Sequence, residues 1–361
     1  MKSVRFMPAW LTGLIFLAVS GCVKSAAEFY TAEDFIRVPK IDMHFHYETS
    51  DTRYLLMADS LNLRFVSPNV DAGRSIDEQY EIAKGLKQQF PGKFAFFGTF
   101  AVDRFGEDDF ADQIIARIDE AMAAGATGIK IWKNIGMTLQ DADSNYVMAD
   151  HPAFEPVFRY LEEKNIPLLA HLGEPRNCWL PLEEMTLDND RRYFERNPQY
   201  HMYLHPEMPS YEDQIEARNN LLERYPGISF TGAHLGSQEW SIDEVANVLD
   251  RFPSYQTEFS ARIGHLQLQA MTDHAKVRDF MIRYQDRIMY GSDVGVSERN
   301  PDFDSVSKGL KAMWLEHWLF LATDQVIAVK DLGGREVKGL QLPAEVVDKI
   351  FSKNAVKFFN L

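Results

Sequence analysis

Two histidines that could bind one metal ion stand close together near the start of the chain. They belong to the sequence Asp42-Met43-His44-Phe45-His46, which continues an apolar run. Because side chains alternate between the two faces of a β-strand, His44 and His46 would point the same way, about 7 Å apart. Histidine pairs of this spacing also occur on protein surfaces without any ligand. The pair therefore predicts a metal site only if further ligands join it.

Three further residues with metal-binding side chains each close a short apolar run. They are His171, His234 and Asp293. In a barrel of parallel strands, each strand delivers its last residues to the same rim, so these three side chains would meet the first two histidines there. Imidazoles and a carboxylate around an open position suit Zn²⁺ or a similar divalent ion. Such an ion polarises a carbonyl or lowers the pKa of bound water to about 7.

Eight strand-like runs predict the fold that would bring these residues together. The runs cover residues 39–45, 63–69, 94–100, 127–132, 167–171, 228–234, 255–260 and 288–293. Between them, apolar residues recur at helical spacing, most clearly over residues 110–124, 154–163, 211–225 and 242–251. Strands that alternate with single helices indicate a parallel sheet. The sequence therefore predicts an α/β protein with a (β/α)8 TIM barrel, for which 361 residues suffice.

The barrel should form one domain over residues 38–361, because no linker interrupts the pattern. The connection 172–210 after the fifth strand is long for a compact domain, and long loops of this kind are usually functional. We expect it to form a lid or pocket wall, with residues 298–311 as a second flap. The segment 343–359 should form one or two helices that pack on the outside of the barrel.

The amino-terminal segment has the features of an export signal. In residues 1–21, Lys2 and Arg5 precede an apolar run that is too short for an ordinary membrane span. Val19-Ser20-Gly21-Cys22 resembles the lipobox of bacterial lipoproteins. That resemblance implies cleavage before Cys22, a lipid on its thiol, and residues 22–37 as a tether to a bacterial membrane in the cell envelope, with the outer membrane and periplasm favoured. Plain secretion with a free Cys22 stays open.

Charge and cysteine content restrict the partners. The formal net charge of −15 argues against nucleic acid, which needs a basic face, and against an electrostatic membrane patch. Membrane contact is therefore expected only through the lipid anchor. The chain has two cysteines, so if Cys22 carries lipid, Cys178 has no disulfide partner. We expect Cys178 to be a buried apolar residue rather than a catalytic thiol.

Taken in order, the motifs resemble the amidohydrolase superfamily, and within it the amidohydrolase-2 branch. The resemblance covers nearly all of residues 41–361. It rests on the first histidine pair, Leu169-Ala170-His171, Gly232-Ala233-His234-Leu235-Gly236, Tyr290-Gly291-Ser292-Asp293 and Ile350-Phe351-Ser352-Lys353-Asn354-Ala355. The resemblance implies that His44, His46, His171 and Asp293 hold one divalent ion, zinc first and manganese as the alternative.

The same resemblance implies roles in proton transfer. His234 would be the general acid or base, and Asp293 would orient or deprotonate the attacking water as well as bind the ion. A neutral imidazole near a cation is suited to exchange protons around pH 7. A site with two metals, in which His234 is a fifth ligand, stays open.

Two lysines follow one another closely in the fourth strand region. Lys130 has three readings: an anchor for a substrate carboxylate, a carboxylated lysine that bridges two metals as in binuclear relatives, or an outward-facing structural residue. A buried lysine must be paired or neutralised, so an inward position would be costly without a use. Lys133 has the opposite parity and is expected at the surface.

Further substrate contacts are expected from the strand ends and the long loop. Arg262, just after the seventh strand, could clamp a substrate carboxylate, or could pair with Glu258 or a loop acid. Trp132 could form part of an aromatic wall, or could serve packing alone. His205 lies in the long loop and could contact the substrate. His151, His265, His274 and His317 follow no strand end and are expected to be structural.

These residues predict a metal-dependent hydrolase that uses activated water on a small carbonyl substrate, such as a lactone, ester or amide, with or without a carboxylate. The resemblance leaves non-oxidative decarboxylation or hydration of an aromatic or unsaturated acid as alternatives on the same metal site. A third alternative is a lipid-anchored binding protein without activity. The partner is a small molecule, and both a second metal and a homodimer stay open.

Overall fold

The structure of the chain is a computed structural model that describes Met1 and residues 28–300 and 302–361. The predicted export signal and Cys22 lie outside the described residues. Within the described part, no helix is long and apolar enough to cross a membrane.

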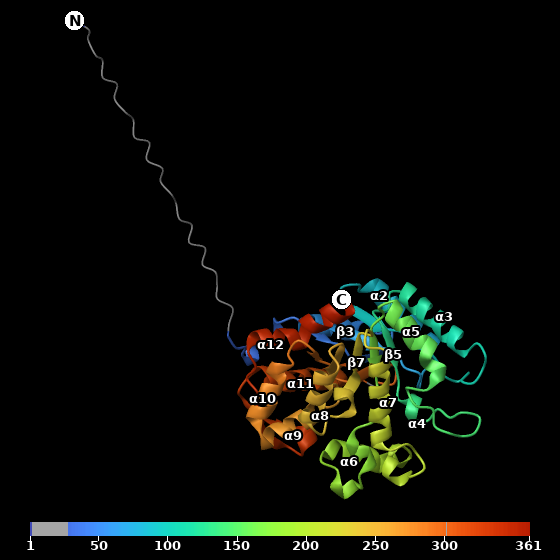
Figure 1. Cartoon of the computed structure of the whole chain (residues 1–361). Helices are drawn as coiled ribbons and strands as arrows, with labels where there is room; N and C mark the ends of the chain where they lie inside the picture. The colour runs from blue at the N-terminus through green and yellow to red at the C-terminus, as the bar shows by residue number, and fades with distance from the viewer. Residues whose placement is uncertain (2–27, 301) are drawn as a thin grey trace.

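Eight parallel strands form the barrel (Figure 1). They are β1 (Lys40–Asp42), β3 (Leu63–Pro68), β4 (Phe94–Phe97), β5 (Ile129–Ile131), β6 (Leu168–Ala170), β7 (Phe230–Gly232), β8 (Tyr255–Glu258) and β9 (Ile288–Met289). Their ladders run β1-β3-β4 and β5-β6-β7-β8-β9. Two backbone bonds close the ring: Lys130 N–H donates to the Gly98 carbonyl at 2.7 Å, and Met43 N–H to the Tyr290 carbonyl at 3.2 Å. The predicted (β/α)8 barrel is confirmed.

Helices connect the strands and cover the outside of the barrel (Figure 1). They are α1 (Arg53–Asp59), α2 (Ile76–Gln89), α3 (Phe110–Ala123), α4 (Asn134–Met137), α5 (Glu155–Glu163), α7 (Tyr211–Arg224), α8 (Ile242–Arg251), α9 (Ile263–Thr272), α10 (His274–Arg283) and α11 (Phe303–Ala322). The four helices expected from apolar spacing are all present. The Ser241 hydroxyl caps α8 by accepting a bond from the Glu244 amide at 3.4 Å. The expectation of a second flap over residues 298–311 is wrong for most of that range, because the helix α11 begins at Phe303.

Two short pairs of strands lie outside the barrel ring. The parallel pair β2 (Phe45–Glu48) and β10 (Val294–Ser297) extends the first and last strands beyond the ring. The antiparallel pair β11 (Val326–Val329) and β12 (Arg335–Lys338) follows α11. Because β1 ends at Asp42 and β2 starts at Phe45, the chain bends between them, and the first histidine pair does not lie on one continuous strand.

The long connection after β6 has structure of its own. It contains α6 (Asp188–Arg196), which Figure 1 places at the lower edge of the molecule, and four 3-10 turns, η3 (Arg176–Trp179), η4 (Leu182–Glu184), η5 (Pro198–Tyr200) and η6 (Met202–Leu204). A small core of Met137, Cys178, Met185, Phe194 and Met202 holds it together. Cys178 is fully buried and its thiol donates to the Tyr200 carbonyl at 3.0 Å, which confirms its structural role.

The carboxyl-terminal helices close one end of the barrel. They are α12 (Ala344–Asp348), a π-helical turn η9 (Lys349–Lys353) and α13 (Asn354–Phe359). Ala355 and Phe359 join the interior residues Ile41, Val66 and Phe97 in one apolar cluster. The expectation that this segment packs only on the outside is therefore wrong for α13, whose apolar face seals the barrel interior.

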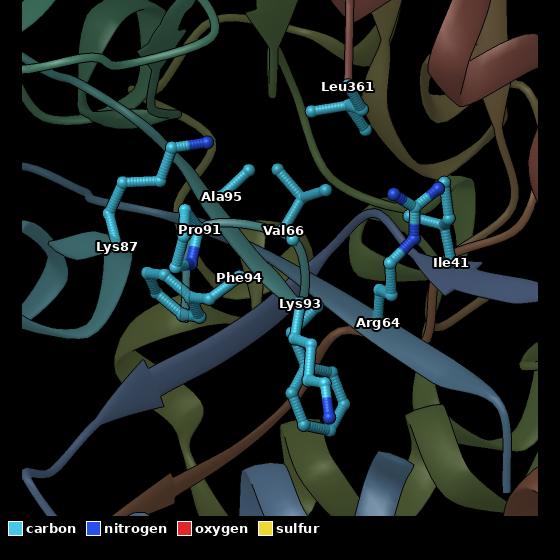
Figure 2. A pocket seen from close by; sticks show the side chains of 11 residues that line it. Ile41, Arg64, Val66, Lys87, Pro91, Lys93, Phe94, Ala95 and Leu361 are labelled. Atoms are coloured by element: carbon cyan, nitrogen blue, oxygen red, sulfur yellow. The ribbon is translucent and has the colours of Figure 1, made fainter. Parts of the chain in front are cut away.

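A small pocket lies beside this closed end (Figure 2). Arg64, Lys87, Gly92 and Leu361 are among the residues that line it, near the first residues of β4. Its volume is about 30 Å³, which leaves room for about two water molecules. It lies at the amino ends of the strands, whereas the predicted site residues follow their carboxyl ends.

Candidate metal centre

The first histidine pair meets Asp293 at the carboxyl ends of the strands. His44 follows β1, His46 lies in β2, and Asp293 lies between β9 and β10. The Nε2 atoms of His44 and His46 are 3.3 and 3.2 Å from Oδ1 of Asp293. One ligand atom from each of the three lies within 4.8 Å of the other two. The ring centroids of the two histidines are 5.3 Å apart.

The other two predicted histidines complete this group. His171 directly follows β6, and the centroid of its ring is 4.2 Å from that of His234. His234 Nε2 lies 4.0 Å from Oδ2 of Asp293, and its ring lies 4.9 Å from that of His44. The five side chains therefore converge on one place. His171 joins it through the His234 ring, since it belongs to neither of the two sets of three ligand atoms found within 4.8 Å among the described residues.

The donor atoms present suit a divalent ion. Among the described residues, Nε2 of His171 and Nε2 of His234 are buried and have no hydrogen-bond partner. A buried polar atom without a partner costs folding free energy, so a ligand at this place would relieve that cost. Imidazole nitrogens and a carboxylate are the donors that zinc and similar ions prefer. The residues therefore fit a metal.

Glu258 is a functional candidate that the sequence interpretation missed, except as a partner for Arg262. It is the last residue of β8 and is fully buried. Its Oε1 accepts from Nδ1 of His44 at 2.9 Å and from the backbone N–H of His234 at 3.1 Å. Because an ionised carboxylate only accepts, His44 carries its proton on Nδ1 and presents Nε2 toward Asp293. Its place at a strand end on the shared rim was the available signal.

Ser260 fixes the orientation of His234. The Ser260 carbonyl lies 2.9 Å from Nδ1 of His234. A carbonyl can only accept, so His234 is protonated at Nδ1 and Nε2 carries the free lone pair. The Ser260 hydroxyl lies 3.0 Å from Nδ1 of His44 and 2.9 Å from Nδ1 of His234. One serine thus contacts the imidazoles of both residues.

Burial sets the protonation states of the group. Burial lowers the pKa of His171 and of His234 well below the ordinary value, and neighbouring cationic groups lower it further. Burial alone would raise the pKa of Glu258, but its electrostatic attraction to His44 and the hydrogen bond from Nδ1 of that residue outweigh burial and lower the pKa to about 2. Burial opposes the shift at Asp293 too, yet His234 and His44 hold its pKa well below the usual range. At neutral pH His171 and His234 are neutral, and the carboxylates of Glu258 and Asp293 are ionised.

The backbone is strained where it presents two of these side chains. Asp293 has φ of 60°, and the turn η7 (Ala233–Ser237) places His234, Leu235 and Ser237 at φ of 60°, 58° and 59°. The left-handed region costs residues other than glycine roughly 1–2 kcal/mol each. Strain of this kind persists where the surroundings hold it and gathers at functional sites.

Lys130 lies inside the barrel. It is fully buried, and its Nζ has no hydrogen-bond partner among the described residues. Burial lowers its pKa to about 8, while the charges of Glu258 and Asp293 act in the opposite direction. The outward-facing alternative for Lys130 is therefore wrong. Its side chain is a buried amine next to the five converging side chains.

A second acid, Glu174, lies next to the site and was not singled out from the sequence. Its Oε2 is 3.7 Å from Nε2 of His171 and 4.0 Å from Nη2 of Arg262. It also forms an ion pair with Lys133. Arg262 thus lies near an acidic residue of the long loop, as in the alternative in which it pairs with an acid of the protein. The expectation that Lys133 lies at the surface is wrong, because this ion pair is largely buried.

The remaining predicted contacts lie farther out. Trp132 is half-buried, and Nζ of Lys133 lies 5.6 Å from the centroid of its ring. Nε2 of His205 lies 3.0 Å from the Pro198 carbonyl and Nδ1 lies 3.5 Å from Oε1 of Glu207, so these polar contacts of His205 stay within the long loop. The four histidines expected to be structural, His151, His265, His274 and His317, contact the Ala153 amide, Asp190, the Gly339 carbonyl and Tyr290.

Comparisons with known proteins support the fold and identify the family. Two solved structures share the fold: the 2,6-dihydroxybenzoate decarboxylase from Rhizobium (TM-score 0.52) and a 2,6-dihydroxybenzoate decarboxylase complexed with 2,6-dihydroxybenzoate (TM-score 0.50). Each is 14% identical to this chain, and the matches cover 90% of it and 99% and 98% of the decarboxylases. No curated protein sequence matches the chain. The Amidohydro_2 family model, described as amidohydrolase, matches residues 41–361. The chain therefore belongs to the amidohydrolase family of metal-dependent enzymes.

Proposed function

We propose that the chain is a metal-dependent hydrolase that acts on a small carbonyl substrate, such as a lactone, an ester or an amide. One observation carries the proposal. The Nε2 atoms of His44 and His46 meet Oδ1 of Asp293 beside a histidine, His234, whose Nε2 carries a free lone pair. A metal-binding set next to a proton acceptor is the arrangement that metal-assisted hydrolysis needs.

In this proposal His44, His46, His171 and Asp293 hold one divalent ion, with zinc as the first candidate and manganese as the second. When bound, such an ion polarises a carbonyl oxygen and lowers the pKa of water to about 7. Glu258 supports the set, because it orients His44 through Nδ1.

His234 and Asp293 share the proton transfer. Nε2 of His234 takes a proton from the attacking water and returns it to the leaving group, while the Asp293 carboxylate orients that water. Burial keeps His234 neutral at pH 7, so it is ready to act as a base. The fixed bond from Nδ1 to the Ser260 carbonyl holds the ring in the tautomer that this role requires.

Lys130 favours a carboxylated substrate for hydrolysis, and such a substrate makes decarboxylation on the same metal site a second candidate. A buried amine without a partner among the described residues could hold a substrate carboxylate near the site. Arg262, Trp132 and His205 are proposed as further substrate contacts. Arg262 is the weaker carboxylate anchor, because Glu174 already lies within 4.0 Å of it.

The test combines metal analysis with turnover. Purified protein is loaded with zinc or manganese and assayed on lactones, esters, amides and carboxylated aromatic acids. We expect a chelator to abolish turnover, and added metal to restore it. The His234→Asn variant should keep its metal and lose turnover. Wild-type protein that binds no metal would refute the proposal and favour the inert binding protein.

We also propose that a lipid on Cys22 anchors the enzyme to a bacterial membrane in the cell envelope. The lipobox-like sequence Val19-Ser20-Gly21-Cys22 supports this. In the Cys22→Ser variant, the protein should move from the membrane fraction to the soluble fraction. Membrane association that persists in that variant would contradict the anchor.

A further inference from the structure

The turn that carries His234 needs support from its surroundings. Residues 234–237 have φ between 58° and 62°, and only one of the four is a glycine. Because other residues avoid this region, an isolated turn of this sequence would move to a right-handed conformation. The orientation of the His234 ring therefore depends on the groups that hold these four residues in place.

Arg218 in α7 supplies a large part of that support. Its Nη1 donates to the Gly236 carbonyl, and its Nη2 donates to Oε1 of Gln238 at 2.9 Å. A methyl group added at Gly236 would lie 2.8 Å from Nη1 of Arg218 and 2.2 Å from the hydroxyl of Tyr255. The guanidinium and the Tyr255 hydroxyl thus occupy the space that a Cβ at residue 236 would need, and a side chain larger than glycine would not fit there.

Arg218 is also a buried cation without an acidic partner. Its exposed fraction is 2%, and among the described residues its guanidinium donates to the Gly236 carbonyl and to the amide oxygens of Asn219 and Gln238, but to no carboxylate. A buried charge of this kind is costly compared with an apolar side chain of the same size. What the guanidinium adds is a planar fork of donors, which can hold several carbonyl groups at once.

Two neighbours of Arg218 on α7 act on the same region. Tyr211, Gln214 and Arg218 are spaced i, i+3 and i+7, so they share one face of the helix. The Tyr211 hydroxyl donates to the Ser237 carbonyl at 2.6 Å. Gln214 Nε2 donates to the Gly136 carbonyl, after β5, at 2.6 Å. This buried polar face of α7 holds backbone carbonyls beyond the carboxyl ends of two barrel strands.

We propose that Arg218 is a positioning residue for His234: by holding the Gly236 carbonyl, it fixes the left-handed turn that directs Nε2 of His234 toward Asp293. The inference rests on the acid–base role proposed above for His234. Within the described part of the chain, the Arg218 side chain donates only to Asn219, Gly236 and Gln238 and makes no hydrogen bond to a residue of the metal-binding set, so its effect must pass through the turn.

The first experiment measures the tautomer of His234 directly. Imidazole nitrogens of the full-length, zinc-loaded protein are labelled with ¹⁵N, and the His234 signals are identified by their loss in His234→Asn. The wild type should show one neutral tautomer with the proton on Nδ1. In Arg218→Lys, which keeps the charge but loses the fork, these signals should broaden or show both tautomers, at unchanged zinc content.

Turnover of p-nitrophenyl acetate provides the second readout. We expect Arg218→Lys to lower kcat at least tenfold while KM changes less than threefold. Arg224→Lys is the matched control, because Arg224 is an exposed residue of the same helix that donates to the Asp150 carbonyl. It should match the wild type in both readouts.

Arg218→Met keeps the inference testable if the lysine variant does not fold. Replacing a buried charge by an apolar side chain of similar volume is often neutral or stabilising, so this variant should fold. A wild-type His234 spectrum in either variant would overturn the inference. If His234→Asn keeps full turnover, the acid–base role fails instead, and the spectra still decide whether Arg218 positions the ring.

Discussion

His171 contacts the ring of His234 but belongs to neither set of three ligand atoms within 4.8 Å of one another among the described residues, so its removal tests whether it is a ligand. We predict that His171→Ala lowers the metal content of the purified protein, because each ligand supplies part of the coordination free energy. Elemental analysis after dialysis against a weak chelator measures this. His274→Ala, which loses only a bond to the Gly339 carbonyl, is the control. Unchanged stoichiometry in the His171 variant would contradict its assignment as a ligand.

Glu258 allows a separate test of how the ligands are oriented. The Glu258→Gln variant keeps the shape of the side chain but removes the charge that fixes the proton of His44 on Nδ1. Loss of such a supporting group typically weakens metal binding roughly 10- to 100-fold. Competition with a chromogenic chelator measures the dissociation constant. The control variant Glu244→Gln on α8 should leave that constant unchanged. Equal metal affinities in the two variants would contradict the role of Glu258 in orienting His44.

The sequence could predict the site residues that follow the strands, but not the neighbouring residues that orient the side chains of those site residues. His44, His46, His171, His234 and Asp293 were found because a barrel brings strand ends to one rim, and all five converge. Glu258 lies at such an end too, yet a lone glutamate there has no motif that separates it from a surface residue. Glu174 was missed, and Lys133 was wrongly expected at the surface, because their pairing depends on how the long loop folds back.

At the scale of the elements, the contact between α13 and the barrel interior contributes a measurable part of the free energy of unfolding. Phe359 is buried, and its ring meets that of Phe97 edge to face at 4.9 Å between centroids. We predict that Phe359→Ala lowers the free energy of unfolding by about 3 kcal/mol or more, because a buried aromatic ring leaves a cavity. Denaturant unfolding measures this. Phe358→Ala, at a half-buried position, should cost clearly less, and equal losses would mean that α13 does not seal the interior.

The spacing of apolar residues predicted the helices and strands well where an element packs against the core with one apolar face. The strands and the amphipathic helices α3, α5, α7 and α8 lie where spacing of apolar residues placed them. The bend between β1 and β2 and the inward face of α13 were not predicted, because both depend on packing against residues far away in the chain. The buried polar face of α7 was missed for a related reason, since polar residues on a helix normally indicate a solvent-exposed face.

The whole molecule should lose stability in acid, and one histidine outside the site accounts for a definable part of that loss. His317 lies in α11 and its Nδ1 is 2.9 Å from the Tyr290 hydroxyl. Burial lowers its pKa from 6.5 to about 4. Between these two values the unfolded chain binds a proton at this residue and the folded protein does not. The free energy of unfolding therefore falls as the pH is lowered through this window, by about 3 kcal/mol in total.

His317→Gln should remove that contribution, because glutamine can still accept a bond from Tyr290 and does not titrate. We predict that the unfolding free energy of the variant, measured by denaturant titration on metal-free protein, falls less steeply than that of the wild type between pH 6.5 and about 4. The buried histidines of the site also have lowered pKa values and contribute with the same sign in both proteins. The difference between the two curves therefore isolates His317, and parallel curves would mean that this histidine takes up its proton in the folded protein as readily as in the unfolded chain.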